Sequence, residues 1–172
     1  MKTRILLLLC LLTPIGQLLA YEVFQKPGDF IKEAFTNVSP LPHTLWITKN
    51  RRQAVQDILG EMPPSLRVRF WEHGKRTAWV LEATGKDYPI TAGIVVNQGK
   101  IEKIKVLIFR EEDGRQVRHT FFTDQFKGAR LTREHVLTRD IDAISGAMLS
   151  VRAMTNMARL ALFYHAEIQS QP

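Results

Sequence analysis

The sequence predicts an α+β fold in which an antiparallel sheet of about four strands is covered by helices, with a long helix at the C-terminal end. Between residues 66 and 109, apolar and polar side chains alternate in successive segments that short turns connect, as in half-buried antiparallel strands. A long helical pattern of apolar residues closes the chain. With 172 residues, 45% hydrophobic and 24% charged, the chain is expected to be globular, with one core.

Residues 1–20 are expected to form a signal peptide or an N-terminal anchor. Lys2 and Arg4 precede an apolar run over residues 5–12, and Ala20 is a small residue suited to a cleavage site. The run is short for a membrane span. The pattern predicts export, with cleavage and anchoring both open.

Residues 21–65 are expected to form a helical lead-in. A short helix is predicted over residues 28–35, followed by a loop at Pro40 and Pro42. Residues 50–62 repeat apolar side chains at helical spacing, with Asn50 as a candidate N-cap. Pro63-Pro64 is predicted to end this second helix.

Four strands are predicted next. In the first, Leu66, Val68 and Phe70 alternate with Arg67, Arg69 and Trp71, which places the two sets on opposite faces. The other strands are predicted over residues 77–83, 88–96 and 101–109. Turns at residues 73–76 and 97–100 connect them as hairpins.

The rest of the chain is predicted to cover the sheet. A polar loop at 111–114 leads to a helical or irregular segment at 121–126 and a loop or weak strand at 132–141. The final helix, over residues 147–167, is apolar on most sides, as in helices buried against a sheet. Residues 66–172 are expected to form the main domain.

The start of the final helix is the candidate functional site. The first N–H groups of a helix lack intrahelical partners, and the helix dipole is positive there. Ser145, Gly146 and Ala147 are small enough to let a phosphate approach these groups. Ser145 is expected to N-cap the helix. Arg152, four residues after Met148, is placed to reach the same phosphate.

Four motifs resemble the FMN-binding domain of the flavin-carrying subunits of the Rnf complex and of the sodium-translocating NADH:quinone reductase. The resemblance spans roughly residues 80–165 and is most specific at the last motif. The motifs are Ala92-Gly93-Ile94-Val95-Val96 with Gly99-Lys100-Ile101, Arg110-Glu111 with Gly114, Asp124-Gln125-Phe126-Lys127-Gly128, and Asp142-Ala143-Ile144-Ser145-Gly146-Ala147.

The resemblance implies FMN as the cofactor and assigns its binding to a defined set of residues. In the family, a flavin transferase joins the phosphate of FMN to a threonine after Ser-Gly-Ala, where this chain has Met148. Glu111 matches a family glutamate near the flavin, although it also suits a plain polar turn. The candidate cofactor-binding residues are Asp142, Ser145, Gly146, Ala147, Met148, Leu149, Ser150, Arg152 and Glu111.

Met148 leaves three outcomes open, because a thioether has no hydroxyl to carry a phosphoester. In the first, FMN binds without a covalent bond. In the second, Ser145 or Ser150 replaces the threonine as the acceptor. In the third, the flavin is lost and the fold serves an interaction or assembly role. The first is favoured because the anion site survives.

The resemblance implies an electron carrier rather than a stand-alone enzyme, located in the periplasm and in contact with the inner membrane. Without Lys2 and Arg4, the 24 basic residues fall to 22 against 17 acids, a net charge of +5. Such a surface suits an anionic membrane or an acidic redox partner better than nucleic acid in an exported protein. The expected partners are a membrane-bound redox protein, another electron carrier and a flavin transferase. Neither metal ligation nor a catalytic triad is indicated.

Overall fold

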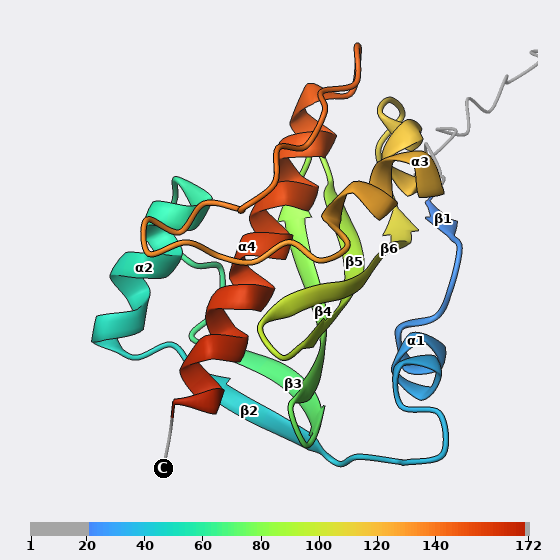
Figure 1. Cartoon of the computed structure of the whole chain (residues 1–172). Helices are drawn as coiled ribbons and strands as arrows, with labels where there is room; N and C mark the ends of the chain where they lie inside the picture. The colour runs from blue at the N-terminus through green and yellow to red at the C-terminus, as the bar shows by residue number, and fades with distance from the viewer. Residues whose placement is uncertain (1–20, 171–172) are drawn as a thin grey trace, which may run out of the picture.

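The computed structural model describes residues 21–170, so the predicted signal peptide or anchor lies outside the described residues. It contains six strands, four α-helices and two short 3-10 turns (Figure 1). The helices are α1 (Pro27–Ala34), α2 (Lys49–Leu59), α3 (Thr120–Thr123) and α4 (Met148–Gln169). The strands are β1 (Glu22–Val23), β2 (Pro42–Trp46), β3 (Arg67–His73), β4 (Arg76–Thr84), β5 (Pro89–Asn97) and β6 (Lys100–Phe109).

All six strands form one antiparallel sheet in the order β1-β6-β5-β4-β3-β2. The α+β class, the antiparallel sheet and the long C-terminal helix are confirmed, and the sheet has two strands more than the sequence predicted. Both additional strands come from the segment expected to be a helical lead-in. β2 lies where a proline loop was expected, and β1 and β2 form the two edges of the sheet.

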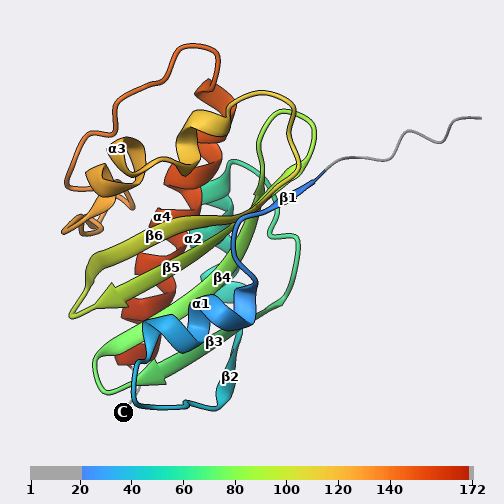
Figure 2. The ribbon, with the colours of Figure 1, turned by 90° about the vertical axis from the view of Figure 1, so that its right-hand side faces the viewer.

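Each face of the sheet has its own helix layer, with α4 on one face and α1 on the other (Figure 2). The larger core lies under α4 and α2. Its centre is Trp79, which is fully buried and stacks on Phe70 at 5.1 Å and Tyr164 at 5.5 Å between ring centroids. The smaller core lies under α1, where Phe30 packs with Val95 and Leu107.

The alternating patterns position the strands as expected, with one irregularity. Val68 and Phe70 face the larger core, while Arg67 and Arg69 are exposed. In β6 the register with β5 shifts after Val95, which turns both Ile101 and Ile104 toward the core although they are three residues apart. A bulge of this kind reverses the side-chain alternation on one strand.

Helix α2 differs from its prediction at both ends. It begins at Lys49 with Thr48 in the N-cap position, and no side chain caps it, so the predicted Asn50 cap is wrong. It ends at Leu59 because Gly60 adopts a left-handed conformation (φ 78°) and its N–H donates to the Gln56 carbonyl at 2.7 Å. This glycine closure stops the helix before Pro63 is reached.

No helix in residues 21–170 combines the length and the apolar character needed to cross a bilayer. The same residues bring together no cluster of three metal-ligating side chains.

Candidate functional site

Helix α4 begins directly after a tight turn over residues 144–147. The Ala147 N–H donates to the Ile144 carbonyl at 2.9 Å, and the Val151 N–H donates to the Ala147 carbonyl at 2.9 Å. Gly146, the third residue of the turn, has φ of 76°. A type II turn requires a positive φ at this position, which glycine adopts without strain. The Ser-Gly-Ala segment therefore sets the direction in which the chain enters α4.

The start of α4 has no side-chain cap. Ala147 occupies the N-cap position and no side chain bonds to it, so the predicted Ser145 cap is wrong. Ser145 lies two residues before the N-cap position, at the exposed tip of the turn. Because no hydroxyl or carboxylate of residues 21–170 caps this terminus, its first N–H groups and the positive end of the helix dipole are suited to an external anion.

Two adjoining hollows flank this terminus, and Lys86 and Met148 line both. The smaller, of about 280 Å³, is bordered by Gly146–Ser150 and by Asp113. The larger, of about 850 Å³, lies between the start of α4, the end of α2 and the end of β4. The larger volume falls within the range of small-molecule sites.

Lys86 brings a second positive charge to the start of α4. It belongs to the four-residue loop between β4 and β5, and its Nζ lies 3.8 Å from Asp113 Oδ2 and 4.0 Å from Asp87 Oδ2. The side chain is 60% exposed, so it is free to turn toward an anion. Sequence reasoning missed Lys86, because nothing in a polar turn indicates which distant helix the turn will meet.

Glu111 holds the loop that carries Lys86. This glutamate is buried, with 5% of its surface exposed. Its Oε1 accepts hydrogen bonds from the backbone N–H groups of Lys86 (2.5 Å), Asp87 (3.0 Å) and Tyr88 (3.1 Å). Glu111 lines neither hollow. Glu111 therefore does not face the hollows. It acts on the site indirectly, by ordering the loop that carries Lys86.

Two arginines of α4 line the larger hollow. Arg152 is exposed on the turn that follows Met148. Arg159 lies deeper, where its Nη1 donates to the Ile58 carbonyl and to Asn156 Oδ1, both at 3.2 Å. Burial lowers the pKa of Arg159 from its ordinary value. Arg152 thus has no ion-pair partner among residues 21–170, whereas Arg159 joins α4 to α2.

The remaining predicted residues divide between the turn and the hollows. Ala147, Met148, Leu149 and Ser150 border the smaller hollow, and Met148 is 70% exposed. Ser150 is buried against Gly114, where an added Cβ would lie 2.3 Å from Ser150 Oγ. Asp142 borders neither hollow. Its backbone N–H donates to Gln125 Oε1 at 2.8 Å, which ties down the chain leading to the turn.

The donor set fits a phosphorylated flavin. Uncapped N–H groups, Lys86 and Arg152 supply the positive potential that a phosphate dianion requires. Leu59, Ala83, Met148 and Val151 give the larger hollow an apolar lining for a ring system. Met148 offers no oxygen for a phosphoester, so no covalent link to the phosphate can form at position 148.

Comparison with known proteins agrees with this geometry. Residues 85–162 match the family described as FMN-binding domain. The comparison with curated proteins gives no match. The matched stretch begins in the Lys86 loop, includes Glu111 and runs through most of α4, so it contains the residues that build the terminus and its cationic loop. This match, over 78 of the 172 residues, shows an FMN-binding domain within the chain and indicates FMN as its cofactor.

Proposed function

We propose that the protein is exported and carries FMN non-covalently as an electron-transfer protein at the periplasmic face of the inner membrane. The observation that carries this proposal is the uncapped start of α4, with Lys86 beside it and a thioether, Met148, at the acceptor position. The basic, apolar N-terminal pattern supports export.

The flavin supplies the redox chemistry when bound, and the chain supplies binding and orientation. The α4 terminus and Lys86 hold the phosphate. Glu111 keeps the Lys86 loop in place through three backbone hydrogen bonds. The apolar side chains of the larger hollow would pack against the ring system. Electron transfer of this kind requires no acid or base from the protein.

The net charge supports a specific class of partner. With +5 outside residues 1–20, the protein is expected to approach an acidic redox protein or an anionic membrane surface, and the association should weaken as salt screens the charges.

The test is to purify the protein from the compartment to which it is exported and to record its absorbance before and after denaturation. Flavin bands that leave the chain on denaturation support the proposal. Flavin that stays with the denatured chain shows a covalent link, most directly through Ser145, the exposed serine. A colourless protein that also fails to bind added FMN favours a flavin-free interaction or assembly module, the alternative that Met148 suggests.

A further inference from the structure

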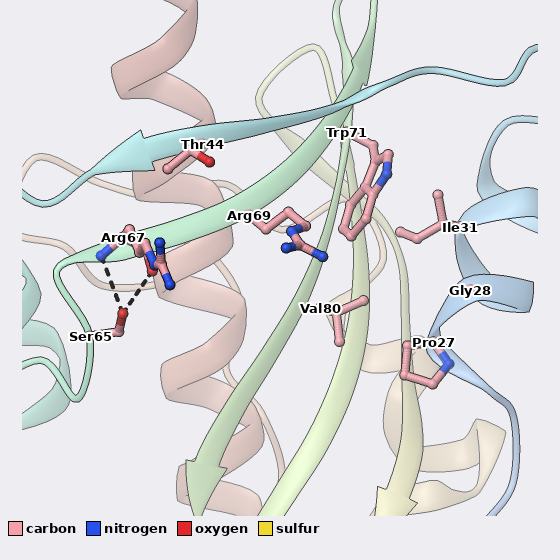
Figure 3. A pocket seen from close by; sticks show the side chains of 9 residues that line it. All are labelled: Pro27, Gly28, Ile31, Thr44, Ser65, Arg67, Arg69, Trp71 and Val80. Carbon is pink, nitrogen blue, oxygen red and sulfur yellow. Dashed lines mark hydrogen bonds between the residues drawn. The ribbon is translucent and has the colours of Figure 1, made fainter.

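A second cavity, of about 710 Å³, lies on the opposite face of the sheet from α4. It is a groove between α1 and the strands β2, β3 and β4 (Figure 3). All of its lining residues precede residue 85, so none belongs to the stretch that matches the FMN-binding domain family. Its lining includes Pro27, Ile31, Arg67, Arg69, Trp71 and Val80.

Two guanidinium groups line this groove side by side. Arg67 and Arg69 occupy alternate positions of β3, which puts them on the same face about 7 Å apart along the strand. Thr44 of the edge strand β2 is the register partner of Arg69. Both arginines are exposed, and neither forms an ion pair with a carboxylate of residues 21–170.

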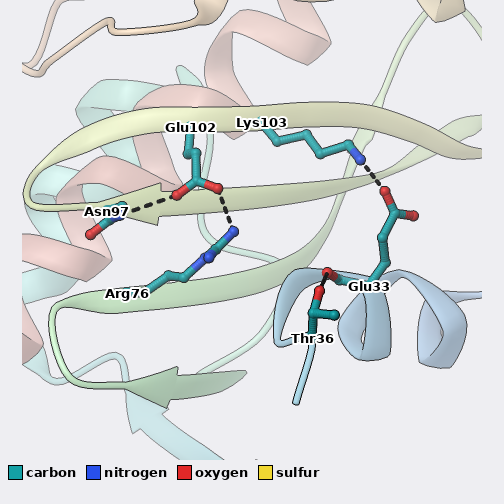
Figure 4. A network of polar contacts seen from close by, with 6 residues as sticks. All are labelled: Glu33, Thr36, Arg76, Asn97, Glu102 and Lys103. Carbon is teal, nitrogen blue, oxygen red and sulfur yellow. Dashed lines mark hydrogen bonds and ion pairs between the residues drawn. The ribbon is translucent and has the colours of Figure 1, made fainter. Parts of the chain in front are cut away.

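Two other cations on this face have carboxylate partners. Arg76 pairs with Glu102, which also accepts from Asn97, and Lys103 pairs with Glu33 of α1 (Figure 4).

An acid of β4, two residues after the lining residue Val80, is also engaged. Glu82 of β4 accepts a hydrogen bond from Thr91 at 2.6 Å and lies 3.5 Å from Arg110. The positive charge of Arg67 and Arg69 therefore remains available to an anion from outside the chain.

The groove also has an apolar floor. Trp71 and Val80 form it from the sheet, and Pro27 and Ile31 of α1 form the opposing wall (Figure 3). Trp71 is only half-buried, so part of its indole is open to the groove. An open indole offers a flat, polarisable surface on which another ring stacks.

We propose that this groove binds a planar organic anion, with its ring system against Trp71 and its acidic group on Arg67 and Arg69. Guanidinium groups bind carboxylate, sulfonate and phosphate oxygens through paired hydrogen bonds. The volume suits a molecule of two or three fused rings. This site is separate from the FMN site because the sheet lies between them.

The test is a calorimetric titration of the intact protein without added FMN, because FMN is itself a planar anion and would compete for the groove. The probes are 2-naphthoate, its neutral counterpart 2-naphthol, and acetate. Saturable one-to-one binding of 2-naphthoate is expected, with 2-naphthol and acetate each at least about tenfold weaker. Equal affinities for 2-naphthoate and 2-naphthol would overturn the proposal, as would the absence of saturable binding.

Variants locate the binding. The double variant Arg67→Gln/Arg69→Gln is expected to lower the affinity for 2-naphthoate about tenfold or more, and Trp71→Leu to lower it independently. The matched control Lys100→Gln/Arg133→Gln removes the same charge from exposed positions outside the groove and is expected to change little. If the control variant loses a comparable part of its affinity for 2-naphthoate, binding depends on net charge alone, which would contradict a site at Arg67 and Arg69. Lys86→Gln should leave 2-naphthoate binding unchanged, which separates this proposal from that for FMN.

Discussion

The imidazole Nδ1 of His165 lies 2.9 Å from the hydroxyl of Thr77 in the core between α4 and the sheet. The Gly99 N–H donates to His165 Nε2 at 3.2 Å, so Nε2 is an acceptor and the proton lies on Nδ1. Trp79 Nε1 donates to the same Thr77 hydroxyl at 2.9 Å. These bonds join α4 to β4 and to the β5–β6 turn, and they require a neutral imidazole.

His165 predicts a loss of stability at mildly acidic pH. Burial lowers the pKa of His165 in the folded protein, so between that pKa and the unfolded value of about 6.5 the unfolded state binds more protons. The free energy of unfolding should therefore fall as the pH drops below about 6.5. Urea denaturation from pH 7.5 to 5 measures it. His165→Gln removes this titration, so its stability should depend less on pH over that range. An equally steep loss in the variant would contradict the assignment.

Glu111→Gln should destabilise the protein and weaken FMN binding together. The substitution replaces a carboxylate that accepts three backbone hydrogen bonds from the Lys86 loop. Losing bonds to a charged group costs about 1.5–3 kcal/mol. Denaturation and FMN titration measure the two effects. Glu112→Gln, at the exposed neighbouring position, is the control and should change neither. If the variant is less stable but binds FMN with unchanged affinity, the Lys86 loop does not contribute to the FMN site.

The sequence predicted the parts of the fold that depend on local repetition. β3 alternates because one of its faces is buried, whereas β5 and α4 are apolar along most of their length because both are buried on most sides. The sequence did not predict β2, because only Leu45 of its five residues is buried and it shows no apolar alternation. Pro40 before it and Pro42 at its first position indicated a loop. An edge strand of this kind forms because β3 offers an unpaired edge, which is a tertiary property.

The sequence predicted the helix start at the candidate site, but not the contacts around it. The small-residue motif at 142–150 indicated the α4 terminus, which the structure shows as an exposed helix start. The sequence did not predict the roles of Lys86 and Glu111, because both depend on contacts between distant segments. Glu111 binds the Lys86 loop about 25 residues before it, and Lys86 lies beside the start of α4 about 60 residues after it. The Ser145 cap failed for a local reason, since the turn at Gly146 shifts the first helical residue to Met148.

Two glycines next to the site should differ in their tolerance of alanine. Gly114 and Gly146 both have positive φ, 85° and 76°, and an alanine there costs roughly 1–2 kcal/mol. At Gly146 an added Cβ would meet no atom within 4 Å, whereas at Gly114 it would meet Ser150 Oγ at 2.3 Å. Gly114→Ala should therefore be the more destabilising, and Ser150→Ala in the same chain should restore part of the loss. Equal midpoints in urea would contradict this packing.

Met148→Thr should create a substrate for a flavin transferase. The substitution places a hydroxyl at an exposed helix start, directly after Ser145-Gly146-Ala147, as in the family motif. When it is co-expressed with a transferase and exported, the variant should gain the mass of FMN less one water. Two controls should gain no mass: the parent chain with the transferase, and Met148→Ser expressed without it. Mass spectrometry of the intact protein measures the change. An unmodified Met148→Thr chain would show that the turn is not recognised.

Lys86→Gln should weaken the binding of FMN much more than that of riboflavin. Lys86 borders both hollows at the uncapped start of α4, where it would contact the phosphate, which riboflavin lacks. Loss of one charge-assisted contact corresponds to about a tenfold loss in affinity. Calorimetric titration with both ligands measures the ratio, and the loss for FMN should diminish in high salt because the contact is screened. Lys100→Gln, at an exposed position that lines neither hollow, is the matched control. If Lys86→Gln weakens FMN and riboflavin equally, Lys86 supports the ring or the loop rather than the phosphate. If the unmodified protein itself binds FMN no more tightly than riboflavin, the α4 terminus does not hold the phosphate.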